Sequence, residues 1–125
     1  MKYVRLRRNI IKNGKLRKSK RRRRRKLDPA RLREWSLAVR GRDMYRCKAC
    51  RSSKKIHAHH LVSKYYVPRY AFLLENGISL CKSCHLGSKG VHGKGTPKNG
   101  FIKELRAIYY SRSIKKALLF MADKV

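Results

Sequence analysis

The sequence predicts a small α+β domain stapled by a four-cysteine metal site, with a helix on each side and a disordered basic arm in front. Three observations support this prediction. The chain has 125 residues, a length typical of one domain with a marginal hydrophobic core. It carries 36 lysines and arginines against 6 aspartates and glutamates, a formal net charge of +30. Its 4 cysteines form two CxxC pairs, and a metal ion bound there would stabilise so small and so charged a core.

The arm is predicted from the first 26 residues, which contain 15 basic residues and no acidic one. A block of like charge cannot fold on itself, so we expect residues 1–26 to be disordered and to contact phosphates. The alternatives are a solvated tail without a partner and a nuclear-localisation signal. The most basic stretch, expected to bind DNA, consists of Arg21, Arg22, Arg23, Arg24 and Arg25.

The positive charge of the whole chain, with a pI near 11.1, predicts a polyanionic partner. Nucleic acid is the usual one, because neutralising phosphates releases counterions. A membrane is disfavoured, since the sequence has no run of about 18 apolar residues. The N-terminus has no apolar segment typical of a signal peptide, so we expect a cytoplasmic, reducing location in which disulfides are unfavourable.

The structured domain is expected over residues 27–98 and begins with a helix. Asp28 can cap this helix, Pro29 suits its first position, and Gly41 can end it. We expect Trp35 to belong to the core rather than to stack on a nucleic-acid base. The residues that share the apolar face of the helix are Leu32, Trp35 and Val39.

The second half of the domain reads as a cysteine knuckle with a polar turn, a short strand, an apolar connector over residues 65–75, and a second strand. A turn at Asn76–Gly77 precedes that strand, which runs through Leu80 into a helix start carrying His85. Gly87, Gly90, Gly93 and Gly95 shorten this helix and predict a flexible basic loop, which offers Lys94 to DNA. Residues 99–125 predict a C-terminal helix that packs on the domain, contacts DNA, or does both.

The two CxxC pairs are Cys47 with Cys50 and Cys81 with Cys84, and 30 residues separate them. This spacing is typical of a tetrahedral zinc site in which each knuckle supplies two thiolates. A redox pair and unrelated buried thiols are the competing interpretations. Four thiolates leave no open coordination position, so we expect this zinc to be structural.

Three histidines stand in the short segment IHAHHL, residues 56–61. Adjacent side chains on a strand point to opposite faces, so His59 and His60 cannot do the same job. Phosphodiester hydrolysis needs a base for water and a cation for the developing charge. One of the two can ligate a metal ion together with His85, the other can face the water, and Asn76 can orient a ring nitrogen.

The ordered set RDMYRCKAC, AHHLV and ENGISLCKSCH, over about residues 40–95, resembles the zinc-stapled branch of the HNH endonucleases. This resemblance implies a ββα-metal core, with His60 as general base and with His59 and His85 as metal ligands. Asn76 would position His60 or support the site. Family members often have a further histidine where this chain has Lys89; His92 is therefore a tentative third ligand, with water or substrate phosphate as the alternative.

The cofactors expected are one structural Zn²⁺ and one catalytic divalent cation. Imidazole ligands suit Zn²⁺, Ni²⁺, Co²⁺ or Mn²⁺, whereas Mg²⁺ would bind mostly through water and phosphate. We expect His57 to be structural or to contact DNA. Asp43 and Glu75 are expected to form salt bridges or caps rather than to bind the metal.

The function implied is metal-dependent hydrolysis of double-stranded DNA by a one-metal, histidine-base mechanism. Small freestanding members of the family are typical phage homing endonucleases, which act in the cytoplasm of the infected bacterium. A role in phage genome packaging or as a toxin would use the same chemistry. We expect a monomer, with a dimer as the alternative, and either nicking or double-strand cutting. The competing function is a non-catalytic, zinc-stapled nucleic-acid-binding protein.

Overall fold

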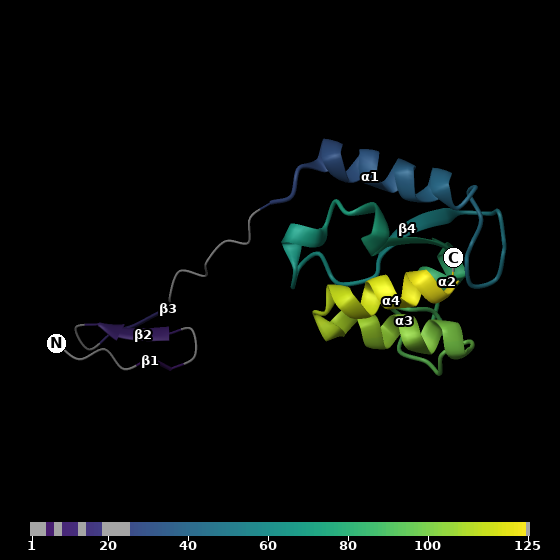
Figure 1. Ribbon diagram of the computed structural model, residues 1–125. Helices are drawn as coiled ribbons and strands as arrows, with labels where there is room; N and C mark the ends of the chain where they lie inside the picture. Colours follow the sequence, from purple (N-terminus) through teal and green to yellow (C-terminus); the bar gives the residue numbers. More distant parts are fainter. Residues whose placement is uncertain (1–4, 7–8, 13–14, 19–25, 125) are drawn as a thin grey trace.

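The structure is a computed structural model, and it describes residues 5–6, 9–12, 15–18 and 26–124 (Figure 1). From residue 26 onward it is a small α+β fold whose sheet has two strands, in agreement with the predicted class. None of the helices in this part of the chain combines the length and apolar character that a membrane span requires. The elements are α1 (Pro29–Arg42), β4 (Ile56–His60), η1 (Pro68–Tyr70), η2 (Leu74–Asn76), β5 (Gly77–Cys81), α2 (Lys82–Leu86), α3 (Gly100–Ser111) and α4 (Ile114–Lys124).

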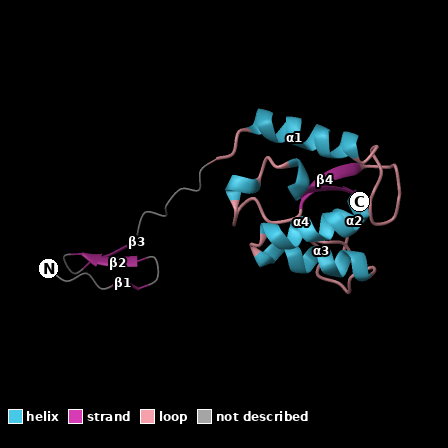
Figure 2. Cartoon of the chain, in the orientation of Figure 1, coloured by secondary structure: helices cyan, strands magenta, loops and turns pink. Residues whose placement is uncertain are grey.

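The two-stranded sheet lies between α1 and the C-terminal helices (Figures 1 and 2). β4 and β5 are antiparallel and pair Ile56 with Cys81 at one end and His60 with Gly77 at the other. Every residue of β5 is buried, as expected for a strand covered on both faces. Helix α2 follows β5 without a loop, so β4, β5 and α2 form one compact unit.

Adjacent histidines of β4 point to opposite faces of the sheet, as strand alternation predicts. The ring of His59 stacks against Tyr109 of α3, with 5.4 Å between ring centroids. The ring of His60 stacks against Trp35 of α1, at 3.8 Å and 9° between planes. The two side chains therefore have different surroundings, which allows them different chemistry.

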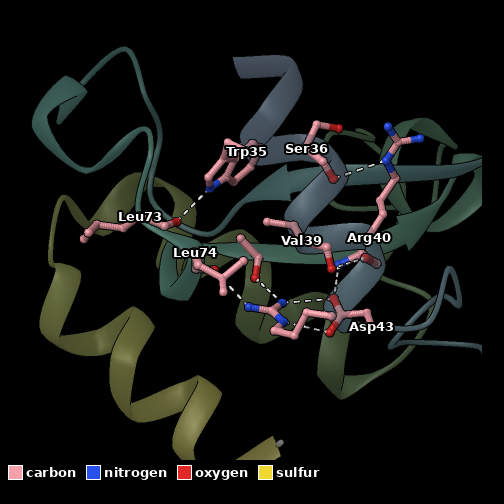
Figure 3. Close-up of polar contacts among 10 residues, drawn as sticks. Trp35, Ser36, Val39, Arg40, Asp43, Leu73 and Leu74 are labelled. Atoms are coloured by element: carbon pink, nitrogen blue, oxygen red, sulfur yellow. Dashed lines mark hydrogen bonds and ion pairs between the residues drawn. The ribbon is translucent and has the colours of Figure 1, made fainter. Parts of the chain in front are cut away.

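Helix α1 begins as the sequence predicts. Asp28 caps it by accepting a hydrogen bond from the backbone N–H of Ala30, and Pro29 is the first helical residue. The helix ends at Arg42, so Gly41, expected to end it, is its penultimate residue. Trp35 is buried and its indole N–H donates to the carbonyl of Leu73 at 2.7 Å, which fixes the ring (Figure 3).

A salt bridge and several hydrogen bonds join the end of α1 to β5 and to the residues just before it (Figure 3). The Asp43 carboxylate accepts from the Arg42 guanidinium and from the backbone N–H of Ser79, both at 2.9 Å. Arg42 also donates to the carbonyls of Leu74 and Gly77, at 2.9 and 2.7 Å. Burial raises the pKa of Asp43, but these hydrogen bonds outweigh it and lower the pKa below the usual value. Asp43 is thus a salt-bridge and hydrogen-bond partner, as predicted.

Gly77, expected to lie in a turn with Asn76, is instead the first residue of β5. Its φ of −131° is ordinary extended backbone, so the position does not need glycine's conformational freedom. A Cβ there would stand 2.6 Å from the Trp35 ring and would also collide with Val39. Because Gly77 has no side chain, α1 can approach β5 closely, and the Trp35 ring can stack on the ring of His60.

The C-terminal segment differs from the single helix predicted for residues 99–125, because it holds two. Asn99 caps α3 by accepting from the backbone N–H of Ile102 at 3.0 Å. The break falls at Arg112, which has a left-handed backbone with φ 57°. Beside it, the Ser111 hydroxyl donates to Ile108 O and accepts from the N–H of Ser113, and such local bonds compete with helical ones. The residues of α3 and α4 that close the core are Ile102, Leu105, Ile108, Ala117, Phe120 and Met121.

The N-terminal segment, expected to be disordered, contains three short strands in its described parts. β1 (Arg5–Leu6), β2 (Asn9–Lys12) and β3 (Lys15–Lys18) form an antiparallel sheet in the order β1-β2-β3. The sequence explains the hairpin in part: β2 and β3 carry isoleucine and leucine, and the dipeptide Asn-Gly between them is the commonest two-residue hairpin signal. The predicted DNA-binding run Arg21–Arg25 lies outside the described residues.

Candidate functional site

The four cysteines come together at one end of the sheet. Cys47 and Cys50 belong to the turn that precedes β4, Cys81 ends β5, and Cys84 lies on α2. All four sulfur atoms lie within 4.8 Å of one another, and the thiols are free. The first knuckle has the expected tight geometry, since the backbone N–H of Cys50 points to the Cys47 sulfur at 3.4 Å. This cluster can hold a metal ion, and all four predicted ligands belong to it.

The crowding of these thiols favours a bound cation. Burial raises the pKa of Cys84 and also that of Cys50. For Cys81 burial acts in the same direction, but hydrogen bonds from Cys84 and from Cys50 lower its pKa to about 7. Four neighbouring thiolates repel one another, so they become stable together only when a cation replaces their protons.

Three histidines form a second cluster, whose members come from three different elements. His59 lies on β4, His85 on α2, and His92 on the loop after α2. A ring nitrogen from each lies within 4.8 Å of the others. The backbone N–H of His92 donates to the carbonyl of His85 at 3.0 Å, which folds the loop back and brings the two rings together. The structure thus joins the tentative ligand His92 to the two expected ones.

The histidine cluster fits a metal ion on two further grounds. The Nε2 atom of His59 is buried and has no hydrogen-bond partner within the described part of the chain. A buried polar atom without a partner costs about 1–3 kcal/mol, a cost that coordination would remove. In addition, burial lowers the pKa of all three imidazoles, to about 4 for His85, so they are neutral as metal ligands must be.

His57 has a more specific position than the sequence indicated. Its Nδ1 atom lies 3.0 Å from Nδ1 of His85, a hydrogen bond in which one ring donates and the other accepts. A metal ion on Nε2 of His85 would leave Nδ1–H to donate to His57. Metal-bound histidines ordinarily have such a partner, which fixes the tautomer and the ring orientation. His57 therefore supports the cluster as a neighbour of a ligand.

His60 lies on the other face of β4 and is held by two contacts. Besides stacking on Trp35, its Nε2 atom lies 2.9 Å from the carbonyl of Ala71. A carbonyl can only accept, so Nε2 carries the proton and Nδ1 keeps a free lone pair. Burial lowers the pKa of His60 to about 4, with a smaller contribution from the charge of Lys64, so the ring is neutral at pH 7. A neutral imidazole with an oriented acceptor nitrogen can remove a proton from water.

Asn76 supports this arrangement through the loop, and the described structure gives it no hydrogen bond to His60. Its side chain is fully buried, accepts from the backbone N–H of Val62 at 2.9 Å, and donates to the carbonyls of Val62 and Tyr70 at 3.3 and 3.1 Å. The next carbonyl along the chain is that of Ala71, which orients His60. Asn76 thus fixes the loop that fixes the base.

Two residues of α3 complete the surroundings of the histidine cluster, and their role was not predicted from the sequence. Tyr109 packs its ring on His59 and, at 4.8 Å and nearly perpendicular, on His92. The Arg106 guanidinium donates to the carbonyls of Gly90 and Gly95, at 2.7 to 2.9 Å. The glycine loop, expected to be flexible, is therefore tied to α3, and this tie positions His92.

The other predicted residues are not members of either cluster. Glu75 is exposed, and within the described chain neither Glu75 nor Asp43 belongs to a group of candidate metal ligands. Lys94 is exposed on the loop that carries His92.

No family model, curated protein or solved structure matches the chain. The geometry and chemistry of the two clusters are therefore the basis for inferring a function.

Proposed function

We propose that the chain is a metal-dependent endonuclease that hydrolyses phosphodiester bonds in double-stranded DNA. One observation carries this proposal. A neutral histidine with an oriented free nitrogen, His60, directly follows a metal-ligand candidate, His59, whose buried Nε2 has no hydrogen-bond partner in the described chain. His60 directly follows His59 on β4, so the proposed base and the histidine cluster are neighbours along the strand.

In the proposed reaction, Nδ1 of His60 takes a proton from a water molecule while the water oxygen attacks phosphorus. The bond from phosphorus to the 3′ oxygen breaks, and that oxygen leaves with the bonding electrons. A divalent cation held by His59, His85 and His92 would stabilise the charge on this leaving oxygen. Ala71 keeps the His60 ring in the tautomer that can accept the proton, and Asn76 holds the loop that carries Ala71.

We propose zinc as the ion of the cysteine cluster, because a tetrahedral set of four thiolates is its usual structural site. Its role is to hold β4, β5 and α2 together. The histidine cluster has only three protein ligands and so leaves positions for water or phosphate. Imidazoles suit Mn²⁺, Co²⁺, Ni²⁺ or Zn²⁺ there, and Mg²⁺ would act mainly through phosphate oxygens.

The proposed substrate follows from charge. A formal net charge of +30 favours a polyanion, and the histidine chemistry favours one with phosphodiester bonds. The order β4, β5, α2 and the positions of His59, His60 and His85 agree with the HNH resemblance. The proposed sub-class is a phage homing endonuclease, because small freestanding enzymes of this type are common among phage-encoded homing endonucleases.

The test is a plasmid nicking assay over a panel of divalent metals, with wild-type protein and with His60→Ala. We expect the variant to lose cleavage by at least about 100-fold, the usual contribution of a general base, while it still binds DNA. A matched control is Glu75→Gln, an exposed position outside both clusters that should cleave as wild type does. If His60→Ala cleaves as wild type does, the mechanism is wrong. If wild-type protein binds DNA but does not cleave it with any of the metals tested, a non-catalytic zinc-stapled binding protein becomes the better proposal.

A further inference from the structure

Exposed tyrosines lead away from the histidine cluster along the surface. Tyr109, which packs on His92 at 4.8 Å, also contacts the ring of Tyr110 at 5.0 Å between centroids. Tyr110 in turn lies 6.3 Å from Tyr66, which follows β4 by a few residues. The contact is supported from the backbone, because the N–H of Ser63 donates to the carbonyl of Tyr109. A row of rings thus connects the candidate metal site with the surface.

The outer members of this row are largely exposed. Tyr110 is 63% exposed and Tyr66 is 42% exposed, and Tyr65, the sequence neighbour of Tyr66, is 58% exposed. Exposed rings so close together are unusual unless something covers them, because exposed apolar area is unfavourable in water. Tyrosine suits a surface that is covered only part of the time, since its hydroxyl stays hydrated when the ring is uncovered.

Two basic side chains lie over these rings. The guanidinium of Arg112 is 4.6 Å from the centroid of Tyr66, and the ammonium of Lys64 is 5.4 Å from that of Tyr65. Arg112 is also the residue with a left-handed backbone between α3 and α4, a position that favours glycine. We call the set Lys64, Tyr65, Tyr66, Tyr110 and Arg112 the tyrosine surface.

We propose that the tyrosine surface binds unpaired bases of single-stranded DNA beside the candidate cleavage site. Aromatic rings interleaved with basic groups match a single strand, because the bases stack on the rings and the phosphates meet the cations. The bases of a double helix are stacked on one another, so their faces are closed to these tyrosines. This inference goes beyond the proposed function, because it requires neither cleavage nor a metal ion in the histidine cluster.

The tyrosine surface lies close enough to the histidine cluster to hold the substrate during the proposed reaction. Only Tyr109 separates Tyr110 from His92, so bases stacked on Tyr110 would lie next to the phosphate at the histidine cluster. A target with a frayed, gapped or bulged strand there would then be held better than a continuous duplex. The surface would select substrates by unpaired bases rather than by sequence.

The test is binding of a fluorescein-labelled oligothymidylate and of a labelled duplex, measured by fluorescence anisotropy with His60→Ala protein so that no strand is cut. In this background we expect Tyr66→Leu and Tyr110→Leu each to weaken single-strand binding about tenfold, a fold-change that corresponds to ~1.4 kcal/mol. Duplex binding should change less than about twofold, because it depends on phosphate contacts elsewhere. Tyr110→Phe, which keeps the ring, should bind the single strand as well as Tyr110 does.

The matched control is Tyr45→Leu. Tyr45 is also exposed and has Arg40 over its ring at 5.5 Å, but it lies in the turn after α1. Equal losses for Tyr45→Leu and Tyr110→Leu, or equal losses of single-strand and duplex binding, would overturn the proposal.

A second measurement uses the unaltered surface. Irradiation of a bound single strand that carries 5-iodouracil should attach it to Tyr66 or Tyr110, as mapped by mass spectrometry. Attachment only at other residues contradicts the assignment. Loss of plasmid cleavage in the nicking assay would leave both of these binding results standing, so the two proposals fail separately.

Discussion

The cysteine cluster and the histidine cluster are both close groups of candidate metal ligands, but they differ in the number and the exposure of their members. In each, the candidate ligand atoms lie within 4.8 Å of one another. The cysteines number four and would fill a tetrahedral shell, whereas the histidines number three and include His92, whose side chain is exposed. A filled shell can only hold the chain together, while an open one can also bind water or phosphate. The comparison teaches that ligand number and access, more than proximity, separate a structural metal centre from a reactive one.

The largest expected effect is on the cysteine side of this comparison. Cys84→Ser removes one thiolate, and we expect the domain to lose cooperative folding and its bound zinc. A structural zinc contributes ~10–16 kcal/mol to folding in small domains, which exceeds the total stability of many of them. Circular dichroism and zinc analysis of the purified protein measure this directly.

Two matched variants sharpen the result. Ser83→Ala alters the exposed neighbour of Cys84 and should fold as wild type does. His85→Gln removes a ligand of the other cluster and should keep both the fold and the zinc. A Cys84→Ser protein that melts cooperatively at the wild-type temperature would show that the cysteine cluster is not structural.

A smaller effect is expected from Arg106→Ala, which releases the loop that carries His92. The hydrogen bonds from Arg106 to Gly90 and Gly95 would be lost, so the third ligand would be held less firmly. Loss of supporting groups typically weakens metal binding 10–100-fold, and we expect about tenfold for Mn²⁺ here, measured by isothermal titration calorimetry.

The control for this prediction is Lys103→Ala, an exposed position of the same helix. It should leave Mn²⁺ affinity unchanged. In a His92→Ala background, Arg106→Ala should have no further effect on Mn²⁺ affinity. A full tenfold loss in that background would mean that Arg106 does not act through His92.

The last prediction concerns the protonation of His60, where the variant Lys64→Gln has the smallest expected effect. Burial under Trp35 disfavours the charged ring, so NMR titration of zinc-loaded protein should give a pKa of about 4 instead of the usual 6.5. The folded chain then binds fewer protons than the unfolded chain between these values. The contribution of His60 to the free energy of unfolding therefore falls as the pH decreases from about 6.5 to about 4.

Lys64→Gln removes the smaller electrostatic cause and should raise the pKa of His60 slightly. Lys54→Gln, an exposed lysine in the turn before β4, should not change it. A His60 pKa near 6.5 in the wild-type protein would mean that the ring is not buried as described.

The parts that could be predicted from the sequence are those set by local rules. Asp28–Pro29 marks the start of α1, and CxxC spacing marks the knuckles, because caps and tight turns depend on a few neighbouring residues. Strand alternation correctly separated His59 from His60.

What the sequence could not give depends on tertiary contacts. The loop of His92 is fixed by Arg106 from a distant helix, and His57 finds His85 only through the fold. The break at Arg112 requires a left-handed arginine, which no simple residue preference predicts. Gly77 was predicted to lie in a turn with Asn76, but it is the first residue of β5, where a side chain would collide with Trp35.

The central claim is that one chain carries two metal centres with different roles. Native mass spectrometry can count them in wild-type protein and in the double variant His85→Gln, His92→Gln, with zinc and Mn²⁺ supplied in the presence of a DNA oligonucleotide. We expect two ions on the wild type, and one ion, zinc, on a double variant that remains folded. A single ion on the wild type, or two ions on the double variant, would contradict the claim.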